Sequence, residues 1–172
     1  MRKSLTPLAL ALALPALAAL PDAASAQDDG PFVTFEVLKP EIAFRMAEAA
    51  MIHCREAGYQ VGVTVVDRFG VPQVFLRDRF AGAHVYETSL RKAWTVVSFR
   101  TNTSDLDTST QPGTESFGIR FLSQALPLGG GLMVNGPTAM VAGIGVSGAP
   151  GPSIDDECAQ AGIDAVADEI AF

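Results

Sequence analysis

A β-hairpin over residues 61–77 constrains the fold of this sequence more than any other stretch. The run Val61–Val66, VGVTVV, has the period of two that a strand requires and presents apolar or small side chains on both faces. Asp67–Gly70 follows with an aspartate and a glycine that suit a type I turn, and Val71–Arg77 returns as the second strand. Pro72 has no N–H, which places this strand at an edge or a bulge. The first strand is therefore expected to be covered on both faces, by the rest of the chain or, on one face, by a partner subunit.

The first 26 residues are typical of a secretory signal peptide, and we predict that they are removed. Arg2 and Lys3 give a basic start, and the apolar run Leu5–Leu20 is followed by a small-x-small cleavage site at Ala24–Ala26. A membrane anchor is the alternative, but the run is short and prolines interrupt it. The sequence therefore predicts an exported protein, periplasmic or secreted.

Cleavage before Gln27 leaves a chain that suits one domain. Residues 27–38 are expected to form an N-terminal arm, and residues 39–172 the domain itself. Without residues 1–26 the chain carries 10 basic and 18 acidic side chains, a net charge of −8. This balance argues against nucleic acid or an anionic membrane surface as a partner. No later stretch of the sequence is long and apolar enough to span a bilayer.

Three helices are predicted from apolar residues at helical spacing. The first begins at Pro40 and ends before Gly58. The second runs from about residue 84 to residue 100. Its buried stripe is expected to consist of Leu90, Ala93, Trp94 and Val97. The last helix covers Ile154–Ala167, and Ser153 with Asp156 resembles a capping box at its start.

Further strands are predicted in the second half of the chain. Asn135-Gly136 is a strong hairpin signal between the runs Leu132–Val134 and Thr138–Val146. Phe117–Leu122 is predicted to add a short strand. Because hairpins supply most of the strand pairs, the sheet should be antiparallel, and helices must cover it since a sheet this apolar cannot face water.

The chain contains two cysteines beyond the predicted leader, Cys54 and Cys158. An oxidising compartment permits a disulfide between them, and the two sulfurs would meet if the first and last helices pack antiparallel. Two buried free thiols are the alternative, and the sequence leaves both open. A metal site is disfavoured because neither CxxC nor HxxxH spacing occurs.

His84 is the candidate ligand for an iron or a substrate. It opens the second helix after a glycine-containing loop, where its ring could reach a bound molecule; a solvated position at the helix start is the alternative. The other histidine, His53, is assigned to a buried or edge position on the first helix. Lys92, placed nearer the polar side of the second helix, and Arg120 are the candidates for a positive charge that would pair with an anionic ligand.

Gly129, Gly130 and Gly131 form a candidate anion site, because successive backbone N–H groups can make a concave nest. The cluster lacks the spacing of a nucleotide-binding loop, and a tight connection between strands is the alternative. Ser147 superficially resembles a nucleophile, but Gly148 directly follows it and the G-x-S-x-G pattern fails. A serine hydrolase is therefore not predicted.

Several of these motifs together resemble the GlcG/HbpS family, which includes the C-terminal module of PduO-type proteins. The resemblance runs from about Lys39 to Ala167. It is carried, in the family's order, by VVDRFG at Val65–Gly70, RKAWT at Arg91–Thr95, Gln111–Gly113, Gly129–Gly131, Val141–Gly148, Asp155–Glu157 and Ala161-Gly162.

The resemblance implies an α+β domain in which helices pack on the faces of a profilin-like antiparallel β-sheet, and it implies a homo-oligomer. Some exported members are similar to haem-binding sensors or scavengers, and others are associated with glycolate or corrinoid metabolism. The predicted export signal favours the haem-binding branch. Haem is therefore the implied cofactor, with His84 as the candidate metal ligand and Lys92 and Arg120 as the candidates beside its carboxylates.

Three functions remain open at this point. A binding protein for haem or a related planar, anionic ligand is favoured over the other two. An enzyme acting on a small acid or a tetrapyrrole would need converging titratable groups, for which Asp67, Lys92, Glu115 and His84 are the candidates. An accessory protein without a ligand of its own would expose an apolar patch beyond the one needed for self-assembly.

Overall fold

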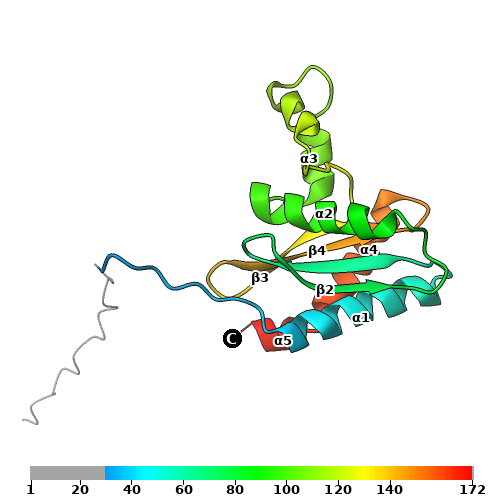
Figure 1. Cartoon of the computed structure of the whole chain (residues 1–172), viewed down its shortest axis with the longest axis horizontal. Coiled ribbons are helices and arrows are strands. Elements are labelled where there is room, and N and C mark those ends of the chain that lie inside the picture. The colour runs from blue at the N-terminus through cyan, green and yellow to red at the C-terminus, as the bar shows by residue number, and fades with distance from the viewer. Residues whose placement is uncertain (1–29, 172) are drawn as a thin grey trace, which may run out of the picture. The chain divides into compact units, whose positions relative to one another are not determined.

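The computed structural model describes residues 30–171 (Figure 1). The predicted signal peptide and its cleavage site lie outside the described residues. Residues 30–34 belong to a separate unit and contain no helix or strand, whereas the second compact unit begins at Phe35. Its elements are α1 (Pro40–Glu56), β1 (Gly62–Asp67), β2 (Pro72–Arg77), α2 (Val85–Phe99), α3 (Thr103–Ser109), the 3₁₀ helix η1 (Glu115–Phe121), β3 (Gly131–Asn135), β4 (Met140–Ser147), α4 (Pro152–Asp164) and α5 (Ala167–Ile170).

The predicted hairpin is confirmed as β1 and β2. Gly70 takes a φ of +84°, and Asp67 Oδ1 accepts hydrogen bonds from the N–H groups of Phe69 (2.8 Å) and Val71 (3.0 Å). The pairing shifts between Val65 and Val66, opposite Pro72. Because β2 is an edge strand in the order β2-β1-β4-β3, the missing N–H of this proline is tolerated at the edge.

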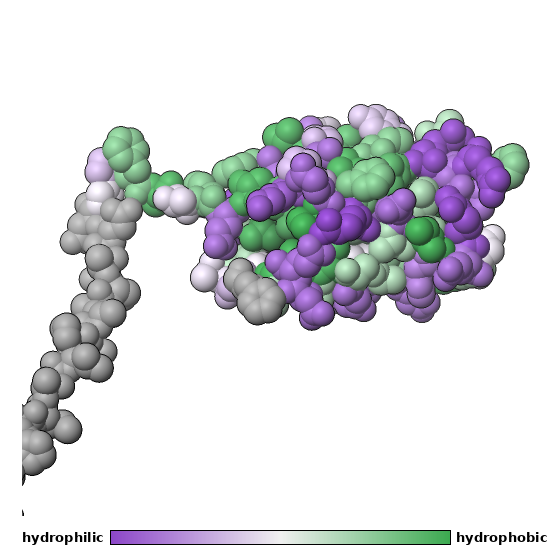
Figure 2. All heavy atoms as spheres, turned by 90° about the horizontal axis from the view of Figure 1, so that it is seen from below, coloured by the Kyte–Doolittle hydropathy of each residue, from purple (hydrophilic) through white to green (hydrophobic). Residues whose placement is uncertain are grey.

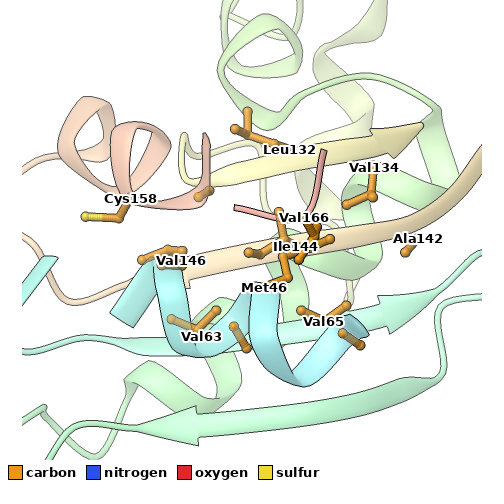
Figure 3. Packing of buried hydrophobic residues seen from close by; sticks show 14 of the residues in the cluster. Met46, Val63, Val65, Leu132, Val134, Ala142, Ile144, Val146, Cys158 and Val166 are labelled. Atoms are coloured by element: carbon orange, nitrogen blue, oxygen red, sulfur yellow. The ribbon is translucent and has the colours of Figure 1, made fainter. Parts of the chain in front are cut away.

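The four strands form an antiparallel sheet, and helices cover both of its faces, so the predicted α+β architecture is confirmed (Figure 1). α1 and α4 pack on one face and α2 on the other. The face toward α1 and α4 is built from aliphatic side chains, among them Val63, Val65, Ile144 and Val146, which Figure 3 shows around Met46 of α1. These residues alternate along β1 and β4, as the period of two requires.

On the opposite face of the sheet, Gly143 and Gly145 of β4 let α2 lie very close to that strand. A methyl group built on Gly145 would lie 2.1 Å from the backbone oxygen of Ser89 in α2, and one on Gly143 would lie 2.9 Å from the oxygen of Ala93. Thr64 and Ser89 meet through their hydroxyl groups at 2.7 Å. Along β4 the helix therefore packs against backbone, whereas beside β1 the side chain of Val66 packs with Ala93 and Val97 of the helix.

Replacing Gly145 with alanine is expected to lower the free energy of unfolding by about 3 kcal/mol, because the added methyl group must push α2 away from β4. Chemical denaturation of the purified variant measures this loss. Gly118→Ala is the matched control, since a methyl group there meets nothing within 4 Å, and it should change stability by about 0.5 kcal/mol or less. Equal effects at the two glycines would contradict the close approach of α2.

A disulfide joins α1 to α4. It links Cys54 and Cys158, whose Cα atoms are 5.5 Å apart. Both residues are buried, with 0% and 1% exposure. The bond closes a loop with a sequence separation of 104 residues, so it ties the start of the domain to its last long helix.

The outer edge of β3 is closed by side chains from the start of α3. Thr103 Oγ1 accepts a hydrogen bond from the Gly131 N–H (2.8 Å), and Asn102 Oδ1 accepts one from the Met133 N–H (2.9 Å). These two donors point away from β4, where a further strand would otherwise pair. The side chains therefore occupy the place of a fifth strand.

Three local predictions were wrong. Residues 117–122 form no strand but belong largely to η1, where every residue is at least partly exposed. The last long helix begins at Pro152 with Gly151 as its N-cap and without a side-chain cap, so the capping box at Ser153 does not form. The second hairpin exists, but Asn135 pairs with Met140 and the turn spans the four residues between them rather than Asn135-Gly136 alone.

Within residues 30–171, the structure has no helix that is both long and apolar enough to cross a membrane.

Candidate functional site

A pocket with a volume of about 290 Å³ lies where the loop after β4 passes the start of α2. Its lining includes His84, Thr88 and Leu128, together with the segment Ser147–Gly151, which begins at the last residue of β4. The Lys92–Asp155 pair also contributes to its lining. Four larger cavities, of about 570, 490, 470 and 310 Å³, contain none of the predicted site residues. The smaller pocket is therefore the candidate site.

His84 lies at the rim of this pocket, immediately before α2, and its side chain is exposed. The imidazole packs against Gly82, where a methyl group would come within 2.7 Å of Nδ1. Thr88 Oγ1 lies 3.0 Å from the carbonyl oxygen of His84 and 2.7 Å from the hydroxyl of Ser147. The site thus combines one accessible imidazole with a pair of hydroxyl groups.

A buried ion pair lies between the pocket and the core. Lys92 Nζ donates to Asp155 Oδ2 at 2.8 Å and to the carbonyl oxygen of Val146 at 2.8 Å. The side chains of Lys92 and Asp155 are only 1% and 6% exposed. Burial raises the pKa of the Asp155 carboxyl above its ordinary value, and the neighbouring ammonium of Lys92 opposes that rise.

Lys92 was placed near the polar side of its helix by the sequence reasoning, and that placement was wrong. The buried face of α2 contains Val85, Ser89, Lys92 and Val96, residues spaced as successive turns of one helical stripe. This spacing was the available signal. The positive charge of Lys92 is paired with Asp155 inside the protein and is not presented to a ligand carboxylate.

The glycine cluster binds an anion, but that anion belongs to the protein. The Gly130 N–H donates to Asp156 Oδ1, and Gly130 takes a φ of +109°. The other oxygen of Asp156 accepts from the hydroxyl of Ser104. Gly129, Gly130 and Gly131 lie behind the pocket rather than in its lining, and a methyl group on Gly130 would lie 2.7 Å from Lys92 Nζ.

Arg120 is separated from the other predicted site residues. It lies on η1, where its guanidinium pairs with Asp107 and donates to the carbonyl oxygen of Thr110 at 2.7 Å. It is not part of the pocket lining. The structure therefore brings His84 and Lys92 to one pocket and leaves Arg120 to connect η1 with α3.

The chemistry of the pocket is that of a binding site with one nitrogen donor. Across residues 30–171, no group of three or more His, Cys, Asp or Glu side chains is placed to hold a metal ion. The exposed imidazole of His84 is a group that binds haem iron in proteins, and Leu128, Pro150 and Pro152 add an apolar lining. A pocket of this size lies at the lower end of the range for small-molecule sites.

Comparison with known proteins identifies relatives over most of the domain. A family model described as "Haem degrading protein HbpS-like" matches residues 38–164. A double mutant of Streptomyces reticuli HbpS is 36% identical, with a TM-score of 0.73, and the match covers 86% of this chain and 97% of that one. A solved complex of PduOC with haem is 27% identical, with a TM-score of 0.71, covering 75% of this chain and 94% of that one.

A curated relative extends the comparison to a longer protein. The corrinoid adenosyltransferase PduO of Citrobacter freundii is 29% identical over 106 residues, which are 60% of this chain and 32% of that protein. This chain thus matches only about a third of the length of that relative.

Proposed function

The chain belongs to the HbpS-like family, and from this premise we propose that it binds haem, with His84 as the residue at the iron. The solved haem complex of a relative with the same fold carries the proposal. The position of His84 supports the choice of ligand, because its imidazole is exposed at the rim of a pocket with an apolar lining. Lys92 and Arg120 form ion pairs within the protein, so the proposal assigns neither of them to the haem carboxylates.

The proposal extends to an exported homo-oligomer. A pocket of about 290 Å³ encloses only part of a porphyrin, and a second copy of the chain would cover the remainder. Exposed large apolar side chains such as Phe44 and Ile52 on α1 are available for contacts between copies. On the face shown in Figure 2, hydrophobic and hydrophilic residues are interspersed.

Haem titration of the purified protein tests the proposal. We expect a saturable shift of the Soret band, and we expect His84→Ala to change the band and to weaken binding about tenfold or more, since it removes the bond to the iron. His53→Ala is the matched control, because this second histidine lies on α1 and outside the pocket. Light scattering on the same samples gives the number of chains in each complex.

Each outcome of the titration has a defined meaning. Saturable binding that is unchanged in His84→Ala would retain the haem function and reject His84 as the ligand. Binding that does not saturate in the wild-type protein would reject the haem function itself. A mass equal to one chain in both free and loaded samples would reject the homo-oligomer.

A further inference from the structure

We propose that the buried Lys92–Asp155 pair is a clamp that holds the wall of the His84 pocket in its binding shape, and that neither residue touches the ligand. The inference rests on the proposed haem function only for the identity of the ligand. Both residues are positioning residues, because they act through the backbone of the segment Ser147–Gly151 and of Val146 just before it.

The pair holds this segment at two points. Lys92 Nζ donates to the carbonyl oxygen of Val146, just before the segment, and Asp155 Oδ1 accepts from the N–H of Ala149, its middle residue, at 3.1 Å. Between these two anchors the chain turns at Gly148, which has a φ of +128°. Breaking the pair therefore releases the first part of one short segment that lines the pocket.

The Lys92 ammonium also replaces a bond of the sheet. The Val146 N–H donates to the carbonyl oxygen of Gly130 at 2.7 Å, and in a regular antiparallel pair the Gly130 N–H would donate back to Val146. The Gly130 N–H instead donates to Asp156. Lys92 Nζ donates to the Val146 carbonyl oxygen in its place. The clamp thus acts at the point where the chain leaves the β3–β4 ladder for the pocket loop.

Direct contact of Lys92 with a ligand conflicts with its surroundings. Its side chain is 1% exposed, and Asp155 and Val146 already accept hydrogen bonds from the ammonium. A ligand carboxylate would have to displace Asp155, whose own charge would then be buried without a partner. Holding the loop explains both contacts of the pair without such a displacement.

The double variant Lys92→Met with Asp155→Leu separates the effect of the pair on the position of the segment from its effect on the stability of the fold. Replacing a whole buried ion pair with apolar residues commonly restores stability, but neither new side chain can bond Val146 or Ala149. We expect near-wild-type unfolding, amide exchange of Ala149 that is about tenfold faster or more, and haem affinity that is about tenfold weaker or more. Val134→Ala, a core truncation at the far end of β3, should change neither the exchange nor the affinity.

Wild-type exchange and affinity in a stable double variant would overturn the proposal and leave the pair with a purely structural role. Faster exchange at Ala149 in a protein that never binds haem would support the clamp and reject the haem function. If the double variant does not fold, Asp155→Asn replaces it. In the wild-type protein Lys92 and the Ala149 N–H bond different oxygens of Asp155, whereas asparagine has one carbonyl oxygen. Wild-type exchange at Ala149 together with wild-type haem affinity would therefore again overturn the clamp.

Discussion

Replacing Lys92 alone with methionine is expected to lower the free energy of unfolding by about 3–5 kcal/mol at neutral pH. The substitution keeps the length of the side chain but leaves the Asp155 carboxylate, 6% exposed, without its cation. An ion that is buried unpaired costs more than the pair itself contributes. Denaturant unfolding of the variant beside the wild-type protein measures the loss.

The loss of unfolding free energy caused by Lys92→Met should become smaller at acidic pH. Burial already raises the pKa of Asp155 in the folded wild-type protein, and Lys92 opposes this rise; removing Lys92 raises the pKa further. The folded variant therefore holds the proton more tightly than the unfolded chain, whose aspartates titrate near pH 3.9. This contribution to stability is present in full below that pH and is lost as the pH rises through the folded-state pKa. The difference in unfolding free energy between the variant and the wild-type protein should therefore be small near pH 4 and large at pH 7.

A surface ion pair provides the control. Arg45 pairs with Glu169, and both side chains are about half exposed. Arg45→Gln should cost about 1 kcal/mol or less, because water screens such pairs. If Lys92→Met loses the same unfolding free energy at pH 4 and at pH 7, the unpaired Asp155 carboxylate is not the cause of the loss.

Removing the disulfide between Cys54 and Cys158 is expected to lower the free energy of unfolding by about 2–4 kcal/mol. The bond restricts the unfolded chain over a separation of 104 residues. In the chain-entropy model a disulfide stabilises the folded state more when the loop that it closes is longer. For a domain of this size the midpoint of thermal unfolding should fall by about 2–4 °C per kcal/mol.

Two measurements separate the bond from the packing of its sulfur atoms. Melting of the wild-type protein with and without reductant changes the bond alone, whereas Cys54→Ala with Cys158→Ala also opens space in the core. A thiol count on protein recovered from outside the cytoplasm, with its N-terminal residue identified, also tests the predicted cleavage before Gln27. Two free thiols and an unchanged midpoint would contradict a stabilising disulfide.

Patterns among neighbouring residues predicted most helices and strands, whereas contacts with residues far away in the sequence determined where the prediction failed. The β1–β2 hairpin followed from alternation and a four-residue turn, which neighbouring residues alone determine. Phe117, Ile119 and Phe121 alternate in the same way but belong to the exposed η1, because alternation is not sufficient when no strand lies alongside. Periodicity therefore predicts a strand only together with its neighbour.

The candidate site was predictable in part for the same reason. The position of His84 before a helix followed from the glycine-containing loop and the helical pattern after it. Helical spacing could have indicated the burial of Lys92, but its partner Asp155 lies 63 positions away, and no local rule connects the two. The sequence offered the glycine cluster as an anion nest or as a tight connection between strands; in the structure the Gly130 N–H donates to Asp156, which is brought there by the packing of α4.

The closure of the β3 edge has a consequence for aggregation. Fibrils that grow by strand addition need two open edges on each molecule, one to accept the previous copy and one to receive the next. In this sheet Thr103 and Asn102 already occupy the outward N–H groups of Gly131 and Met133, so within residues 30–171 β2 is the edge left for strand addition. Pairing through this one edge ends with two copies, so the sheet offers no template for an endless one.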